Sequence, residues 1–346
     1  MTGPARRARA WLAAAALSGA AAVAGCGDET QPPAPAPVAC DPAPGLICTV
    51  AGTGIAGDGA DGLAALTTRL YLPQDVTIGP DGRLYIVDWN NHRIRVRQEN
   101  DTLKIVAGIG ELGPASDDPA TGRLNHPTQV SFDGAGHLVI AAWHNSRIKT
   151  MDAATGELID VCGTGKRGFA GDGGPAADAV LDLPVAVVFD PAGNMLISDQ
   201  ANNRIRKVDA ATQTISTFAG VGKCLDPAAC PPLGDDGPAI SAFISLPQGQ
   251  SARPAGRIDV DAAGNVYIAD RDNSVIRKVV GDGLPGAGTI TTFAGTGAAG
   301  YAGDGGQAAA ARLQRPCGIF VVRAGPEAGR VFIADTYNSV IRVIWE

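Results

Sequence analysis

The segment VCGTGKRGFAGDGG, residues 161–174, decides between two very different folds. Residues 163–168 have the spacing G-x-G-x-x-G, which lets a backbone approach the pyrophosphate of a dinucleotide when it follows a strand. The same loop returns at Ala51, Ala107, Ala219 and Ala294, and four of the five copies keep that spacing. A nucleotide site occurs once in a domain, so five copies indicate a repeated structural unit instead.

The residues around the glycine loop repeat with it. Each copy continues to an apolar residue three positions before a proline, then to an apolar run, a turn rich in Gly, Asp and Pro, and a second apolar run. Each copy then reaches a pattern based on Asp-x-x-Asn-x-x-Ile-Arg/Lys, as DWNNHRIR (88–95), AWHNSRIK (142–149), DQANNRIR (199–206), DRDNSVIR (270–277) and DTYNSVIR (335–342). Short β-prone runs separated by turns predict one small four-stranded antiparallel sheet per copy.

These repeated residues resemble the NHL repeat, the blade of a family of β-propellers, over about residues 46–346. The resemblance implies an all-β propeller built from four-stranded blades. Five copies favour five blades, with residues 46–51 supplying the outer strand that the last copy lacks and so removing an open sheet edge. A six-bladed ring with one degenerate blade is the alternative.

The N-terminus predicts export and a lipid anchor. Three arginines among the first nine residues precede an apolar run over residues 11–23, which is too short to span a hydrocarbon core of about 30 Å. The sequence VAGC, residues 23–26, resembles the bacterial lipoprotein signal, which implies acylation of Cys26. We therefore expect a signal peptide (1–25), a Pro/Ala-rich tether (26–45) and a propeller (46–346) attached to the membrane of a bacterial envelope, facing the periplasm or the cell surface. An ordinary secretory signal with a chance cysteine is the alternative.

The repeated Asp and Asn are expected to brace their own turns, because such side chains bond nearby backbone groups. They are Asp88, Asn91, Asn145, Asp199, Asn202, Asp270, Asn273, Asp335 and Asn338, with Ala142 replacing the Asp of the second copy. If the strands run from inner to outer, these turns and the glycine loops emerge on one face. Loops on a rigid scaffold commonly carry binding. The two residues that directly follow each Asp position vary between copies. Among them, Trp89, Trp143, His144, Arg271 and Tyr337 are predicted to form a ligand rim. The alternative is that these side chains pack on neighbouring loops.

The sequence gives little support for a metal site, a cofactor site or a nucleic-acid partner. The net charge of −7 and the dispersed arginines argue against a nucleic-acid partner. No cofactor is predicted; calcium at Asp58, Asp172 and Asp304 is an alternative, although calcium takes about six to eight oxygens and each loop offers one or two carboxylates. No His or Cys pair has the spacing of a zinc site.

Export to an oxidising compartment makes disulfides plausible. We expect Cys224 to pair with Cys230 across a short insert and Cys40 to pair with Cys48 near the tether.

The function that the sequence favours is a binding or scaffolding module for a protein, peptide or glycan, engaged through the loop-rich face. The resemblance also allows an enzyme, since some NHL-like propellers resemble amidating lyases or lactonases with a metal at the channel mouth. No repeated His or Glu set stands there, and we predict no catalytic residue. A purely structural envelope protein is the third class.

Overall fold

The computed structural model describes residues 51–346 except 54, 72, 74, 112–121, 153, 225–229, 250–251, 285, 304–305, 326–327, 336, 338–339 and 345–346. The predictions for the signal peptide, the tether, Cys26, Cys40 and Cys48 fall outside the described residues. No helix among the described residues is long and apolar enough to cross a membrane.

The described residues form five antiparallel sheets, one for each copy of the repeat. The first contains β1 (Asp75–Ile78), β2 (Leu84–Asp88), β3 (Arg93–Arg97) and β4 (Leu103–Ala107). The second contains β5 (Pro127–Phe132), β6 (Leu138–Ala142), β7 (Arg147–Met151) and β8 (Leu158–Cys162), and the third β9 (Pro184–Phe189), β10 (Met195–Asp199), β11 (Arg204–Val208) and β12 (Ile215–Ala219). The fourth contains β13 (Gly237–Pro238), β14 (Ile258–Val260), β15 (Val266–Asp270), β16 (Val275–Val279) and β17 (Thr289–Ala294), and the fifth β18 (Gly318–Val321), β19 (Val331–Asp335) and β20 (Val340–Ile344).

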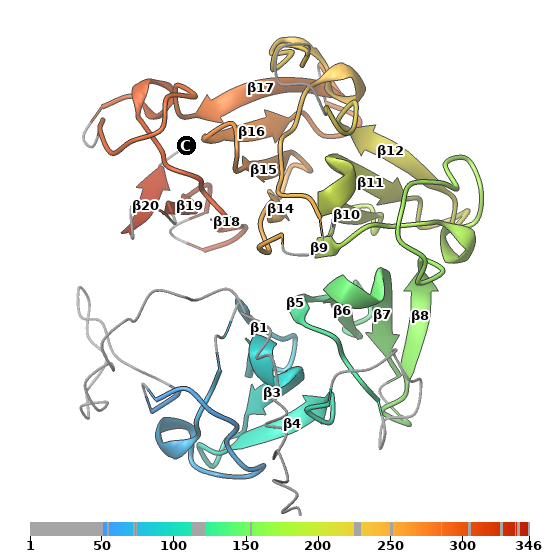
Figure 1. Cartoon of the computed structure of the whole chain (residues 1–346), viewed down its shortest axis with the longest axis vertical. Coiled ribbons are helices and arrows are strands. Elements are labelled where there is room, and N and C mark those ends of the chain that lie inside the picture. Colours follow the sequence, from blue (N-terminus) through green and yellow to red (C-terminus); the bar gives the residue numbers. More distant parts are fainter. Residues whose placement is uncertain are drawn as a thin grey trace, which may run out of the picture. The chain divides into compact units, whose positions relative to one another are not determined.

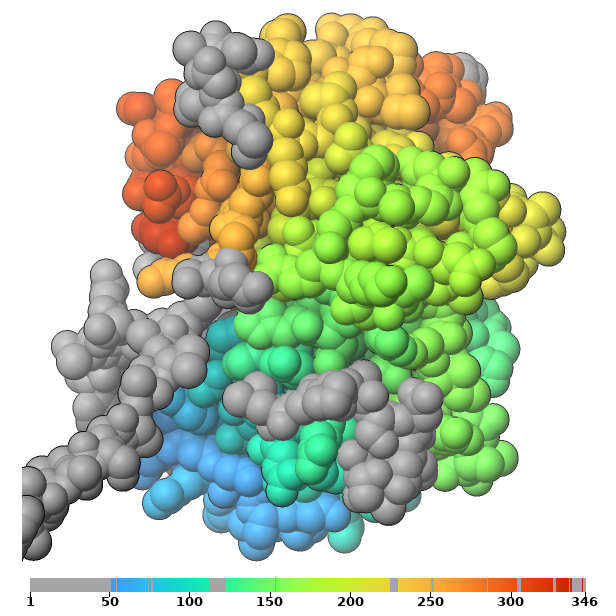
Figure 2. Space-filling view, turned by 45° about the vertical axis from the view of Figure 1, so that its right-hand side comes forward, coloured from blue at the N-terminus to red at the C-terminus, as the bar shows by residue number. Residues whose placement is uncertain are grey.

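The strands of each sheet follow one another in space as they do in the chain, apart from the two-residue β13, which pairs with the outer strand β17. The first strands contact one another in sequence order, β1 with β5, β5 with β9, β9 with β14, and β14 with β18. Figure 1 shows these strands nearest the middle and β4, β8, β12 and β17 outermost. Figure 2 shows successive copies side by side in colour order, from blue through green and yellow to orange. This repeated meander is the β-propeller fold.

The core lies between neighbouring sheets, which explains why the strands are apolar on both faces. Ile148 and Cys162 of the second sheet pack with Val187 and Ile197 of the third, and all four are fully buried. A single small sheet could not bury two apolar faces, so stacking with its neighbours supplies the driving force for folding. Burial raises the pKa of the Cys162 thiol to about 12, so this cysteine is a packing residue.

The turns with the Asp-x-x-Asn pattern contain single 3-10 turns, η2 (Trp89–Asn91), η3 (Trp143–Asn145) and η5 (Gln200–Asn202). Four others follow the glycine loops, η1 (Ala65–Thr67), η4 (Ala176–Asp178), η6 (Ala239–Ser241) and η7 (Ala308–Ala310). The Nδ2 of Asn91 donates to the carbonyl of Gly57 at 2.9 Å, and that of Asn202 donates to the carbonyl of Gly168 at 2.6 Å. The turns and the glycine loops therefore share one end of the sheets, which we call the loop face.

The structure shows why the loops need glycine without any nucleotide. Gly163 and Gly220 have φ angles of +95° and +96°, in the region where glycine is favoured. A Cβ atom at these positions would lie 2.6 Å from the carbonyl oxygen of Ser146 and 2.4 Å from that of Asn203. Each outer strand thus ends in close backbone contact with the turn of its own copy.

The described residues of the fifth sheet form three strands, β18 to β20. Residues 46–50, which would supply most of the expected fourth strand, fall outside the described residues, so closure of the propeller by the N-terminus stays a prediction.

Candidate functional site

The repeated Asp is the buried centre of a hydrogen-bond network. The Asp88 carboxylate accepts from the backbone N–H of Tyr71 at 2.8 Å, from Nδ2 of Asn91 at 2.8 Å and from Nε of Arg95 at 2.8 Å. Asp199 and Asp270 repeat the arrangement with their own Asn and Arg. Each Asp therefore stabilises its own turn through the Asn and also joins that turn to the residues just before the first strand of the same copy.

The second and fifth copies keep parts of this network. Ala142 has no carboxylate, and Oδ1 of Asn145 instead accepts the backbone N–H of Asn125 at 3.0 Å. In the fifth copy Oδ1 of Asp335 accepts the backbone N–H of Gln314 at 2.7 Å, while Asn338 falls outside the described residues. The turn is thus held to the strand entry even where the repeat pattern is broken.

The carboxylates considered for calcium have cationic partners. Asp58 lies 3.0 Å from Nη2 of Arg95, and Asp172 lies 2.5 Å from Nη2 of Arg206. Both arginine side chains are fully buried, so these carboxylates compensate buried positive charge. Asp304 is not described, and in the part of the chain that is described no group of three or more His, Cys, Asp or Glu residues could hold a metal ion.

Side chains on the loop face meet between neighbouring copies. We define a junction as three residues: the first turn residue after the Asp position of one copy, the residue before the proline of the next copy, and the second turn residue of that next copy. Junction one–two consists of Trp89, His126 and His144, and junction four–five consists of Arg271, Arg315 and Tyr337. The first residue of each junction contacts the next copy. The ring centroids of Trp89 and His126 lie 4.7 Å apart, and Nη2 of Arg271 donates to Tyr337 Oη at 3.0 Å.

Four of the five predicted rim residues occupy these two junctions, and Trp143 stacks on His144 beside junction one–two. The five differ in depth. Trp89 and Trp143 are each 2% exposed and Arg271 is 7% exposed, whereas His144 is half-buried and Tyr337 is 36% exposed. Three of the five residues, Trp89, Trp143 and Arg271, are thus buried.

The aromatic and imidazole rings at junction one–two form one cluster, which we call the His/Trp cluster and which contains Trp89, His92, His126, Trp143 and His144. His126 is central, with ring centroids 4.4 Å from His92 and 4.8 Å from His144. The His144 ring stacks on Trp143 at 4.1 Å and 16°. His126 has a φ of +54°, which is uncommon for a residue other than glycine and turns its ring toward the neighbouring copy.

The hydrogen bonds assign the proton on each imidazole. Nδ1 of His126 lies 2.8 Å from the side-chain oxygen of Asn125, which only accepts, so His126 carries its proton on Nδ1. The same N–H is shared with Nδ1 of His144 at 3.1 Å, which accepts it, so a neutral His144 carries its proton on Nε2. Nδ1 of His92 accepts the backbone N–H of His126 at 3.2 Å. All three rings are neutral in this arrangement.

Burial keeps the cluster uncharged. Burial, together with smaller contributions from the neighbouring His92 and His144, lowers the pKa of His126 to about 3. Burial also lowers the pKa of His144 to about 4, with smaller contributions from Arg167 and His92, and lowers the pKa of His92. The cluster is therefore a neutral, hydrogen-bonding site at physiological pH rather than a cationic one.

Three N–H groups of this cluster are buried without an acceptor among the described residues: Nε1 of Trp89, Nε1 of Trp143 and Nε2 of His144. Buried donors in folded proteins nearly always find a partner, because an unmade hydrogen bond costs about 1–3 kcal/mol. Three such donors in one cluster suit a ligand with acceptor oxygens, such as hydroxyl or carbonyl groups. His126, His144 and Asn125 are half-buried, whereas both indoles are buried.

The sequence did not indicate His126 and His92 as members of the site. His126 occupies the position before the repeated proline, where the third and fifth copies have Leu183 and Arg315. The variation of this residue between copies was the sequence signal that could have indicated its place in the site.

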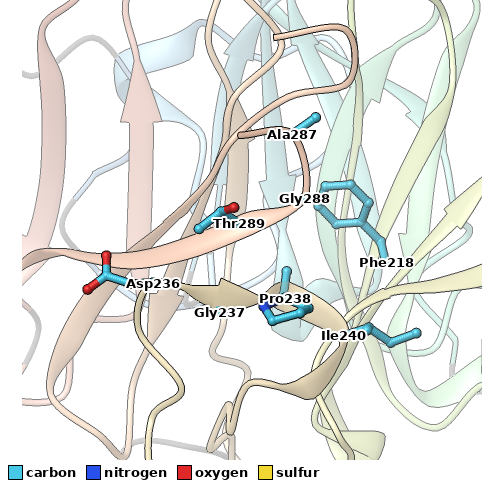
Figure 3. A pocket seen from close by; sticks show the side chains of 9 residues that line it. Phe218, Asp236, Gly237, Pro238, Ile240, Ala287, Gly288 and Thr289 are labelled. Carbon is cyan, nitrogen blue, oxygen red and sulfur yellow. The ribbon is translucent and has the colours of Figure 1, made fainter. Parts of the chain in front are cut away.

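A hollow of about 360 Å³ lies at the outer edge of the third and fourth sheets. Figure 3 shows Phe218 of β12, Pro238 of β13 and Thr289 of β17 around it. Among the described residues that line it, Asp236 is the one with a charged side chain. The hollow offers few groups for recognition compared with the junctions.

The NHL repeat family matches residues 70–96. Protein SUPPRESSOR OF QUENCHING 1, chloroplastic, of Arabidopsis thaliana is 27% identical over 244 residues, which are 67% of this chain and 22% of that protein. Human NHL repeat-containing protein 3 is 30% identical over 156 residues, which are 44% of this chain and 38% of that protein. The chain thus spans between about a fifth and two fifths of the length of these relatives.

A solved structure described as an auxiliary nutrient binding protein from Bacteroides ovatus superposes with a TM-score of 0.52 at 15% identity, over 80% of this chain and 60% of that one. At that identity the likeness shows the fold. The chain is a β-propeller whose repeats are similar to the NHL repeat.

Proposed function

We propose that the protein is an exported, lipid-anchored β-propeller that binds a protein, peptide or glycan through its loop face, with the His/Trp cluster as a contact point. The observation that carries this proposal is the set of three buried N–H donors without an acceptor among the described residues. A neutral cluster of buried donors with half-buried imidazoles suits the acceptor oxygens of a sugar or a peptide backbone better than a cation or a hydrophobic ligand. The description of the Bacteroides ovatus protein as a nutrient binding protein agrees with a binding role.

The binding test uses tryptophan fluorescence, because two of the four tryptophans in the sequence belong to the cluster. The protein is titrated with a panel of soluble oligosaccharides and tetrapeptides. We expect at least one of them to change the emission saturably. The variant His144→Ala should weaken that binding by about tenfold or more, since it removes one hydrogen bond in a buried site.

The control variant is His137→Ala, which removes an exposed histidine from the turn between β5 and β6, at the opposite end of the sheet. It should leave the affinity unchanged. If no compound alters the emission, or if the two variants bind alike, the His/Trp cluster is not the contact point.

The anchor is tested separately by labelling cells with a fatty-acid analogue. The arginines, apolar run and VAGC sequence at residues 6–26 support acylation of Cys26. Label should enter the wild-type protein and be absent from Cys26→Ser. Equal labelling of both proteins would exclude Cys26 as the attachment site without affecting the binding proposal.

A further inference from the structure

Junction four–five has the geometry of junction one–two with a different chemistry. Arg271 and Arg315 take the places of Trp89 and His126, and Tyr337 takes the place of His144. The guanidinium carbons of Arg271 and Arg315 lie 5.2 Å and 5.1 Å from the centre of the Tyr337 ring.

A third arginine joins this junction. Nη1 of Arg253 donates to Tyr337 Oη at 3.3 Å, beside the bond that Arg271 makes to the same oxygen at 3.0 Å. Three guanidinium groups therefore surround one phenol. Tyr337 organises them through its ring and its hydroxyl, since guanidinium groups favour aromatic faces.

The positive charge of this cluster exceeds the negative charge beside it. Asp272 forms an ion pair with Arg271. Among the described residues no carboxylate lies within ion-pairing distance of Arg253 or Arg315. Guanidinium groups stay protonated in proteins, so three of them around one ring repel one another unless an anion lies between them.

Arg271, the buried arginine of the cluster, has an N–H donor without a hydrogen-bond partner among the described residues. The Arg271 side chain is 9% exposed, and its Nε is buried without an acceptor among the described residues. Arg253 and Arg315 are exposed, so a solute can reach the cluster from the loop face. Arg315 has a φ of +48°, the counterpart of the φ of +54° at His126.

We propose that Arg253, Arg271, Arg315 and Tyr337 form a binding site for the oxyanion group of a small ligand, a carboxylate or a phosphate monoester. The planar fork of an arginine matches either group through paired charge-assisted hydrogen bonds. The proposal goes beyond the binding proposed at the His/Trp cluster, because a different junction with different chemistry carries it.

The test measures binding of three related sugars to the full mature chain by calorimetry at low ionic strength. Glucuronate presents a carboxylate, glucose 6-phosphate presents a phosphate, and glucose presents neither. At least one of the anionic sugars should bind saturably in the millimolar range or tighter, and glucose should bind at least about tenfold more weakly. Comparison of the two anionic sugars identifies which oxyanion the site prefers.

Two exposed positions allow the site to be changed without a threat to folding. Arg253→Gln and Arg315→Gln should each weaken binding of the anionic sugar by about tenfold, while Arg315→Lys should recover part of the loss through its charge. Arg69→Gln is the control, since it removes an exposed arginine from the first copy and changes the net charge equally.

The outcomes separate this site from the other one. Binding that survives in Arg253→Gln and Arg315→Gln, or that falls equally in Arg69→Gln, would overturn the proposal, as would equal binding of glucose and the anionic sugars. His144→Ala should leave the anion affinity unchanged. Loss in that variant would place the anion at the His/Trp cluster instead.

Discussion

The change Asp199→Ala is expected to destabilise the protein by about 3 kcal/mol, from the cost of about 3–5 kcal/mol for removing one partner of a buried ion pair. The carboxylate accepts from the backbone N–H of Asp182 at 2.7 Å, from Nδ2 of Asn202 at 2.8 Å and from Nη1 of Arg206 at 3.3 Å. Asp199 and Arg206 are fully buried. Arg206 keeps a bond to Asp172 at 2.5 Å, which places the expected cost at the lower end of that range.

Urea unfolding followed by circular dichroism measures this change. For a propeller over residues 46–346, a loss of about 3 kcal/mol corresponds to a fall of about 5 °C in the melting temperature. The control Asp172→Ala should cost about 1 kcal/mol, since its carboxylate is 36% exposed and solvent screens it.

The double variant Asp199→Ala/Arg206→Met removes both charges of the pair. It should be more stable than the sum of its single variants by about 1 kcal/mol or more, because neither charge is left buried alone. A loss below about 0.5 kcal/mol for Asp199→Ala, or strictly additive effects, would refute the view that this network holds the turn.

Three further predictions follow from buried groups and close contacts. Gly220→Ala should lose more unfolding free energy than Gly173→Ala. Both glycines have φ angles near +90°, but a Cβ atom at Gly220 would lie 2.4 Å from the Asn203 carbonyl oxygen, whereas one at Gly173 would meet nothing within 4 Å. Equal losses would contradict the close-packing explanation. Burial raises the pKa of Asp199 to about 6, so between about pH 4 and 6 the folded state keeps a proton that the unfolded state has lost. The unfolding free energy of wild type, measured relative to Asp199→Asn by urea unfolding, should therefore fall as the pH rises through that window. The absence of such a slope would contradict the explanation. The His126 and His144 rings have pKa values lowered to about 3 and 4, so their NMR signals should show neutral rings down to about pH 5, and protonation near pH 6.5 would contradict their burial.

The sheets could be predicted from the sequence because each copy contains its own turns and β-prone runs, so the signal was local and recurred five times. The common end of the turns and glycine loops followed from the strand order alone. The Asp–Arg pairs were visible as a fixed spacing within the pattern, although their burial was not.

The depth of the junction residues could not be predicted, because it depends on contacts between copies. Trp89 is buried by His126, which lies in the next copy, and a single copy contains no information about that neighbour. Arg271 looks like a surface residue until Tyr337 and Arg315 of the next copy are placed beside it. The positive φ of His126 and Arg315 depends on the same packing.

The most direct test of the central claim, that ligands engage the loop face, compares a photo-reactive phenylalanine at two positions in cells. Asn90 lies on the loop face within η2, and Ala135 lies in the exposed turn between β5 and β6, at the other end of the sheets. Irradiation should give a ligand adduct, seen by mass spectrometry, at position 90 and none at position 135. An adduct at position 135 alone, or equal adducts at both positions, would contradict the account.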